Sequence, residues 1–154
     1  MLMAGPGKHE FLADMNASAL HREQQSFEAI PSSARAARQF VASTLRQHGA
    51  SAKEIRDYAL VVSELATNII EHGDGSSMVV YLDVADPGWW EVEVVGGSLP
   101  STQLLEPDTW TVASADEPSG RGLGIVRHLM DEIESGTNAG RVSIRCRRRR
   151  DESS

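Results

Sequence analysis

Three stretches of this chain repeat apolar residues at the three- and four-residue spacing of an amphipathic helix. They are residues 32–49, residues 52–73, and the stretch from the glycine-rich segment at Gly120 to about Gly136. Ser32 and Ser33 are good N-cap residues for the first helix. In the second helix the apolar residues form one arc, which predicts a buried face. The polar residues opposite that arc are Glu64, Asn68, Glu71 and His72.

Other stretches have the β-rich composition or the alternation of strands. We expect strands at residues 26–30, 78–84, 89–95 and 142–147. The sequence Ala-Asp-Pro-Gly at residues 85–88 predicts a turn that joins the two middle strands into a hairpin. Together the elements predict an α+β two-layer sandwich, in which three helices lie on one face of a mixed, mostly antiparallel sheet.

The length of 154 residues is typical of a single domain. We expect residues 1–25 to be a poorly ordered N-terminal tail, with a short helix over residues 10–20 as an alternative for part of it. The domain should occupy residues 26–148, and residues 149–154 should form a C-terminal tail. Residues 97–121 are rich in Ser, Thr, Pro and Asp, and a loop of this length in a compact domain is usually functional.

Composition excludes several classes of protein. No apolar run approaches the roughly 18 residues of a membrane span, and the N-terminus lacks the order of a signal peptide. We therefore expect a cytoplasmic protein. The net charge of −7 argues against general affinity for nucleic acid. The basic run at residues 148–150 is short and is followed at once by Asp151. The single Cys146 excludes an internal disulfide and suggests a small buried hydrophobe.

The polar strip of the second helix suggests chemistry. Glu64 and Asn68 are four residues apart, so they lie on neighbouring turns of one face. A carboxylate there can polarise a hydroxyl, and a carboxamide oxygen can bind Mg²⁺, as phosphoryl transfer requires. The alternative is an ordinary solvated face. Glycines that lead into a helix let backbone N–H groups approach phosphate oxygens.

Two motifs in combination indicate a family. They are Glu-x-x-x-Asn-x-x-x-His-Gly at residues 64–73 and Gly-x-Gly-x-Gly at residues 120–124. This pair resembles the GHKL ATPase superfamily of gyrases and histidine kinases, and most closely its small anti-sigma factor serine kinases. The resemblance runs from about Phe27 to Arg147. It implies the GHKL fold, with ATP bound between the second helix, the glycine-rich helix start and residues 97–121 as the ATP lid.

The resemblance also implies residue roles. Glu64 would be the general base toward a substrate hydroxyl, and Asn68 would be a Mg²⁺ ligand. Arg38 on the first helix would face a protein partner. The residues implied in nucleotide binding are Asn68, His72, Gly97, Gly120, Arg121, Gly122, Leu123 and Gly124.

One position departs from the family. Its members end the second hairpin strand with Asp-x-Gly, and the aspartate accepts a hydrogen bond from the adenine amino group. Here Gly96 stands in place of the aspartate, and Ser98 in place of its glycine. A hydrogen bond to a charged group contributes about 1.5–3 kcal/mol. We therefore expect weakened ATP binding with poor discrimination between ATP and GTP, which Gly96→Asp should reverse.

Two functions remain open from the sequence. The first is an anti-sigma factor with serine kinase activity, which holds a sigma factor inactive and phosphorylates an antagonist protein in the partner switching that regulates transcription, for example in a stress response. The second is a module of the same fold, impaired in nucleotide binding, that sequesters a regulatory partner without catalysis. Neither function requires direct contact with nucleic acid or a membrane. Dimers are common in the resembled kinases.

Overall fold

A computed structural model describes residues 22–97 and 118–152 of the chain. Most of the expected N-terminal tail and most of the loop at residues 97–121 lie outside these ranges. The elements in chain order are β1 (Arg22–Phe27), α2 (Ser32–Gln47), α3 (Ala52–His72), β2 (Met78–Asp83), β3 (Trp89–Gly97), α4 (Pro118–Leu129), β4 (Glu132–Asn138) and β5 (Arg141–Arg149).

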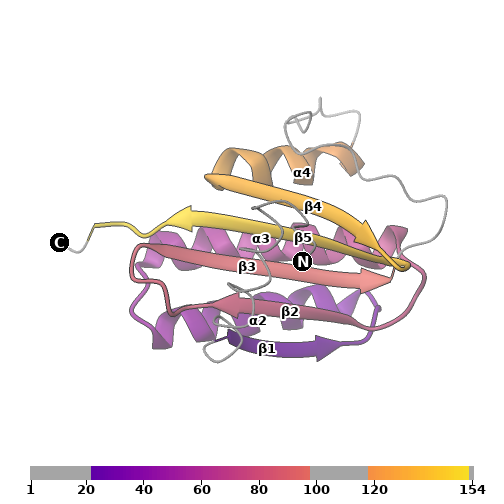
Figure 1. Ribbon diagram of the computed structural model, residues 1–154, viewed down its shortest axis with the longest axis horizontal. Coiled ribbons are helices and arrows are strands. Elements are labelled where there is room, and N and C mark those ends of the chain that lie inside the picture. Colours follow the sequence, from indigo (N-terminus) through magenta and orange to yellow (C-terminus); the bar gives the residue numbers. More distant parts are fainter. Residues whose placement is uncertain (1–21, 98–117, 153–154) are drawn as a thin grey trace, which may run out of the picture.

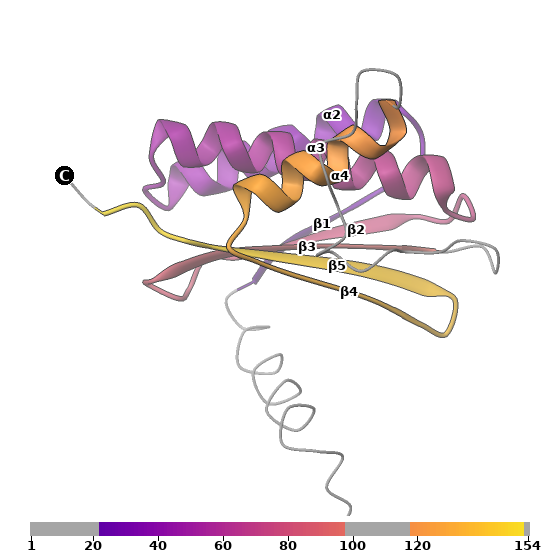
Figure 2. The ribbon, with the colours of Figure 1, turned by 90° about the horizontal axis from the view of Figure 1, so that it is seen from above.

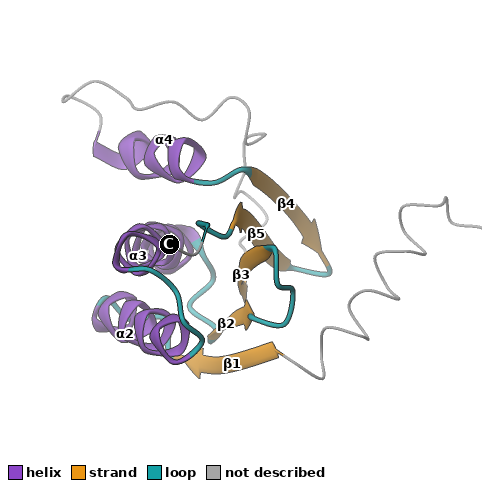
Figure 3. Ribbon diagram, turned by 90° about the vertical axis from the view of Figure 1, so that its left-hand side faces the viewer, coloured by secondary structure: helices purple, strands orange, loops and turns teal. Residues whose placement is uncertain are grey.

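The helices and the strands form two layers (Figure 1, Figure 2). The strand order is β1-β2-β3-β5-β4, and every neighbouring pair is antiparallel. All three helices cover the same face of the sheet (Figure 3). This arrangement confirms the predicted α+β two-layer sandwich. No helix within residues 22–97 and 118–152 covers the opposite face of the sheet.

The long helices match the prediction closely, although one cap differs. α3 begins after Ser51 in a capping box, in which the Ser51 side chain and the Glu54 side chain each accept a backbone N–H of the other residue. α2 starts at Ser32 without any side-chain cap, so the predicted serine N-cap is wrong. It ends before Gly49, whose φ of 86° lies in the left-handed region that glycine adopts freely.

The first strand starts earlier in the chain than predicted. β1 spans Arg22–Phe27 instead of residues 26–30, and it pairs with β2 from Arg22 opposite Asp83 to Phe27 opposite Met78. It is a polar edge strand, and only Phe27 in it is buried. Its hydrogen-bonding partner defines this strand, because the sequence at residues 23–26 has no hydrophobic alternation.

The third helix is shorter than predicted, and a strand was missed. α4 ends at Leu129, and β4 then forms a hairpin with β5. Ile133 suited the apolar stripe of a helix, but in the structure it is paired with Cys146 of β5. The hairpin turn contains Ala139 and Gly140 with φ values of 52° and 78°. Two left-handed residues in succession favour a tight hairpin whose twist matches the strands.

The core lies between α3 and the middle of the sheet. The fully buried side chains from α3 meet those from β2, β3 and β5, and burying each aliphatic side chain contributes roughly 1.5–3 kcal/mol. These core residues include Tyr58, Val62, Leu65, Ala66, Leu82, Val92, Val94, Ile144 and Cys146. α3 is thereby fixed in rotation, so its polar strip remains at the border of the core.

A buried carboxylate anchors the start of α3. Glu54 is 3% exposed, and its Oε1 accepts the Ser51 backbone N–H at 2.8 Å. Its Oε2 accepts the Trp90 indole N–H at 2.7 Å and the Asp151 backbone N–H at 2.8 Å. Burial by itself would raise the pKa of Glu54, but these hydrogen bonds together lower it below its usual value. One side chain thus joins α3, β3 and the chain that follows β5.

The C-terminal arginines also have structural partners. Arg148 is buried and donates to Asp57 Oδ2 at 2.7 Å. Arg150 donates to the carbonyl oxygen of Val84 at 2.8 Å, and its guanidinium lies 3.6 Å from the centre of the Trp90 ring. β5 also extends to Arg149, one residue past the expected domain boundary. These contacts give Arg148 and Arg150 structural roles in the fold.

Glu54→Gln should lower the free energy of unfolding at pH 7 by about 1–3 kcal/mol, because the amide cannot satisfy all three N–H donors. A lowered pKa in the folded state contributes stability above the unfolded pKa of about 4.3, and this contribution is lost as the pH falls through the folded value. The difference between the parent and Glu54→Gln should therefore shrink in urea titrations below about pH 4.

Glu28→Gln is the matched control, because Glu28 is exposed. Its effect on the free energy of unfolding should stay within about 0.5 kcal/mol at each pH. Equal destabilisation by the two substitutions would contradict the role assigned to Glu54.

Candidate functional site

The structure brings the two sequence motifs into contact. Glu64 of α3 is half-buried, and its side chain lies against the backbone of Gly122 in α4. A Cβ atom added at Gly122 would be 2.8 Å from Glu64 Cδ and would overlap Glu64 Oε2. Any side chain at this position would therefore displace the carboxylate. Figure 3 shows α3 and α4 side by side, as this contact requires.

The start of α4 explains why glycines occur there. The helix begins at Pro118, and proline suits the first turn because its missing N–H would have no partner there. Gly120, Gly122 and Gly124 therefore lie inside the first two turns of the helix. This differs from the sequence-based prediction, in which the glycines lead into the helix. Gly124 is buried, and Leu123 packs against the core. Backbone N–H groups in the first turn of a helix lack intrahelical partners and attract anions, and in α4 this turn includes Gly120.

Gly120 and Arg121 belong to α4 by their backbone, but their side-chain environment lies outside the described structure. Their contacts with phosphate, and that of Leu123, remain predictions.

Asn68 lies one turn after Glu64 on α3 and is half-buried. His72 is exposed near the end of the helix, and its Nε2 lies 3.9 Å from Glu71 Oε2. Over residues 22–97 and 118–152 no three His, Cys, Asp or Glu side chains gather as a metal site. Mg²⁺ typically keeps several waters and takes one or two protein oxygens together with substrate phosphates. A single half-buried carboxamide on α3 fits that mode of binding.

The end of β3 is closely packed on both sides. A Cβ atom at Gly96 would overlap Cγ2 of Ile69, which comes from α3. The Asp74 carboxylate and the Ser76 hydroxyl fill the space that a Cβ atom at Gly97 would occupy. The Asp74 backbone N–H also donates to the Gly97 carbonyl at 3.3 Å. Hydrogen bonds from Ser76 hold the pKa of Asp74 below its usual value. The described role of Gly97 is thus to pack against the loop after α3, and its contact with a nucleotide remains a prediction.

Arg38 is separated from this site. It is exposed on α2, and α2 lies on the opposite side of α3 from α4 (Figure 3). The structure therefore does not bring Arg38 to Glu64 and Gly122. A role in binding a partner protein would use a different part of the helical layer, and it remains a prediction.

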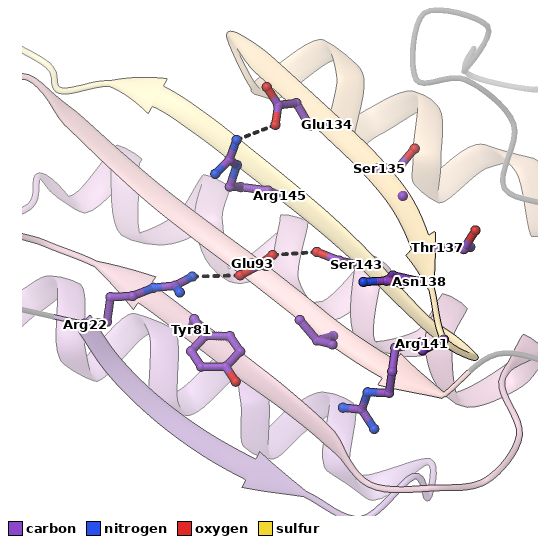
Figure 4. Close-up of a pocket in the computed structure, with 13 residues that line it drawn as sticks. Arg22, Tyr81, Glu93, Glu134, Ser135, Thr137, Asn138, Arg141, Ser143 and Arg145 are labelled. Carbon is purple, nitrogen blue, oxygen red and sulfur yellow. Dashed lines mark hydrogen bonds and ion pairs between the residues drawn. The ribbon is translucent and has the colours of Figure 1, made fainter. Parts of the chain in front are cut away.

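A hollow of about 610 Å³ lies on the sheet face opposite the helices (Figure 4). Four of its charged side chains form two ion pairs: Glu93 accepts from Arg22 at 2.7 Å, and Arg145 donates to Glu134. Glu93 also accepts from the Ser143 hydroxyl at 2.5 Å. The predicted site residues do not line this hollow, so we assign the candidate site to α3 and α4.

The family follows from the match over the whole motif region. The profile of the histidine kinase-like ATPase domain matches residues 27–147. The chain belongs to this family. Both motifs and the contact between Glu64 and Gly122 fall inside the matched range. No described helix is long and apolar enough to cross a membrane.

Two solved structures share the fold. The RsbU and RsbW domains of Rv1364c from Mycobacterium tuberculosis match with a TM-score of 0.62 and 20% identity, over 84% of this chain and 32% of that chain. The SiaB-SiaC complex from Pseudomonas aeruginosa matches with a TM-score of 0.59 and 15% identity, over 90% of this chain and 96% of that chain. This chain thus spans about a third of the mycobacterial one. A search of curated proteins finds no match.

Sequence reasoning missed three residues around the site. Ile69 fits the apolar arc of α3, and nothing in that pattern shows that it meets Gly96. The Asp74 and Ser76 pair follows the helix as an apparently ordinary turn. A signal for this pair did exist, because an Asp two residues before a Ser commonly accepts local backbone hydrogen bonds.

Gly122→Ala tests the contact between the helices. The added methyl group should push the flexible Glu64 carboxylate aside, while alanine favours the helix by about 1 kcal/mol over glycine. We expect a thermal midpoint within a few degrees of the parent but ATP turnover lowered by about 10²-fold, as for loss of a positioned base. Formation of ADP from ATP and thermal unfolding measure the two effects.

Gly136→Ala is the control for this substitution, because a Cβ atom there meets nothing within 4 Å and the residue has no positive φ. Its turnover should equal that of the parent. Unchanged turnover in Gly122→Ala would show that Glu64 has no role that depends on its position.

Proposed function

We propose that this protein is an anti-sigma factor with ATP-dependent serine kinase activity. In this proposal it holds a sigma factor inactive and phosphorylates a serine of a small antagonist protein. The observation that carries the proposal is the contact of Glu64 with Gly122, because it holds a carboxylate one turn beyond the anion-attracting start of α4. A base beside a phosphate-binding helix start is what phosphoryl transfer to a hydroxyl needs.

Each residue of the site has a defined task in this mechanism. Glu64 accepts the proton of the substrate serine hydroxyl as that oxygen attacks phosphorus. Asn68 holds Mg²⁺ through its carboxamide oxygen. The free backbone N–H groups in the first turn of α4, which includes Gly120, orient the phosphates. Gly122 and Gly124 have no side chains to block the approach, and Arg121 offsets the negative charge that develops on the phosphates. Bound ATP supplies the phosphoryl group that is transferred.

Protein partners would use the helical layer beyond this site. Arg38 is exposed on α2 and available to a partner surface. The similar solved structures include an RsbW domain and a complex of SiaB with SiaC, which supports a role in protein association. In this proposal the partners are a sigma factor and its antagonist in the cytoplasm, and a homodimer is a possible assembly.

A second function is favoured by one observation. Ile69 fills the space beside Gly96, where the resembled kinases have the carboxylate that binds adenine. A chain that has lost this hydrogen bond could keep the fold to sequester a partner without catalysis. The two functions differ in phosphate transfer, and the next substitution distinguishes them.

Glu64→Gln should keep Mg²⁺-ATP binding but lose phosphate transfer by about 10²-fold or more, because an amide cannot accept the hydroxyl proton. The assay incubates each protein with [γ-³²P]ATP and a lysate of the source cells. We expect one labelled protein band whose phosphate is stable to acid, as phosphoserine is. Binding without any transfer by the parent protein would favour the sequestering module, and an acid-labile label would indicate transfer to histidine.

Asn68→Ala should remove the dependence of ATP affinity on Mg²⁺, because the carboxamide oxygen is the protein ligand of the ion. Calorimetric titration with and without Mg²⁺ measures this. Arg56→Ala, an exposed position nearer the N-terminus of α3, should leave the dependence intact. The assignment of Asn68 fails if its variant responds to Mg²⁺ as the parent does.

A further inference from the structure

Gly96 and Ile69 form a closely fitted pair between sheet and helix. Gly96 is buried in β3, opposite Val142 of β5, and Ile69 is 3% exposed. A Cβ atom at Gly96 would overlap Ile69 Cγ2 and would lie 3.7 Å from the Cβ atoms of Ile69 and Met78. The pair is therefore in direct contact, with the branch of Ile69 in the space that a residue-96 side chain would need.

The branch of Ile69 cannot easily move away. Cγ2 is bonded directly to Cβ, and a β-branched residue in a helix has one strongly preferred χ1 rotamer. Its position is thus set by the backbone of α3, which is fixed by its buried face. An aspartate at residue 96 would have to displace either this branch or the strand. Gly96→Asp alone therefore cannot restore the adenine contact, contrary to the expectation from the sequence.

The carboxylate that packs against this strand end, Asp74, lies on the other side of β3. Asp74 packs against Gly97, and successive residues of a strand face opposite sides of the sheet. Its Oδ1 is already held by the backbone N–H and the hydroxyl of Ser76, at 2.8 and 2.5 Å. Asp74 therefore does not replace the missing side chain on the inner side of Gly96.

We infer that Ile69 and Gly96 together determine the nucleotide selectivity of this protein. Ile69 follows Asn68 in α3, and its branch occupies the place beside Gly96 where the resembled kinases have the carboxylate that binds the purine amino group. The protein then binds a purine nucleotide through its phosphates and Mg²⁺ and holds ATP and GTP alike. This inference rests on the nucleotide site of the proposed function, but not on the phosphate acceptor.

The test is a set of substitutions at the two positions, each titrated with Mg²⁺-ATP and with Mg²⁺-GTP by calorimetry. The parent should bind the two nucleotides within about threefold of each other. Gly96→Asp combined with Ile69→Ala should prefer ATP by about 10- to 150-fold, which is the value of one charged hydrogen bond. Gly96→Asp alone should gain no preference and should have a lower thermal midpoint.

Ile69→Val is the matched control, because valine keeps the branch that meets residue 96 and loses only the terminal methyl group. Gly96→Asp combined with Ile69→Val should therefore behave as Gly96→Asp alone. A stability cycle with Gly96→Ala checks the contact without the carboxylate: the methyl group should lower the thermal midpoint in the parent and have a smaller effect in Ile69→Ala.

Four results would overturn the inference. They are a parent that prefers ATP by more than about tenfold, a gain in ATP preference by Gly96→Asp alone, a folded double variant without any gain, and absence of nucleotide binding in every variant. The proposed kinase function is tested separately. If the parent binds both nucleotides alike but transfers no phosphate, the inference holds and the kinase function is wrong. If the parent transfers phosphate but strongly prefers ATP, the kinase function holds and the inference is wrong.

Discussion

The close approach of α3 and α4 at Glu64 and Gly122 is the constraint on which the candidate site depends. A carboxylate can lie on the backbone of a neighbouring helix only where that helix has no Cβ atom. The approach in turn depends on the buried face of α3, which fixes the rotation of the helix against the sheet. Packing therefore determines which polar side chains reach α4, and the same rotation directs Ile69 to Gly96.

Buried polar contacts fix the other end of α3. Glu54 accepts three N–H donors from three parts of the chain, and Arg148 is paired with Asp57 on the same helix. Such groups are costly to bury unless every donor and acceptor is satisfied. Their satisfaction here positions α3 along its axis as well as in rotation. The end of α3 that carries Glu64 and Asn68 can then remain half-exposed while the helix keeps its position against the sheet.

Much of the fold could be predicted because its signals are local. α2 and α3 have regular apolar spacing. His48 and Gly49 follow α2, and Gly73 follows α3. The bounds of β1 and the presence of β4 could not be predicted, because each strand is mostly polar and is defined by its partner strand. The proximity of Glu64 to the glycines of α4 came from the family resemblance and not from spacing. The fit of Ile69 to Gly96 could not be found, since each residue suits its own element and only the packed structure shows the contact.

The most direct test of the site records ¹H–¹⁵N NMR spectra of the parent protein as ATP is added with and without Mg²⁺. The account predicts Mg²⁺-dependent shifts in the amide signals of Gly122 and Gly124 and in the side-chain amide of Asn68. Signals of Tyr81 and Ser143 on the open sheet face should stay unchanged. Shifts confined to that open face, or no shifts at millimolar ATP, would contradict the account.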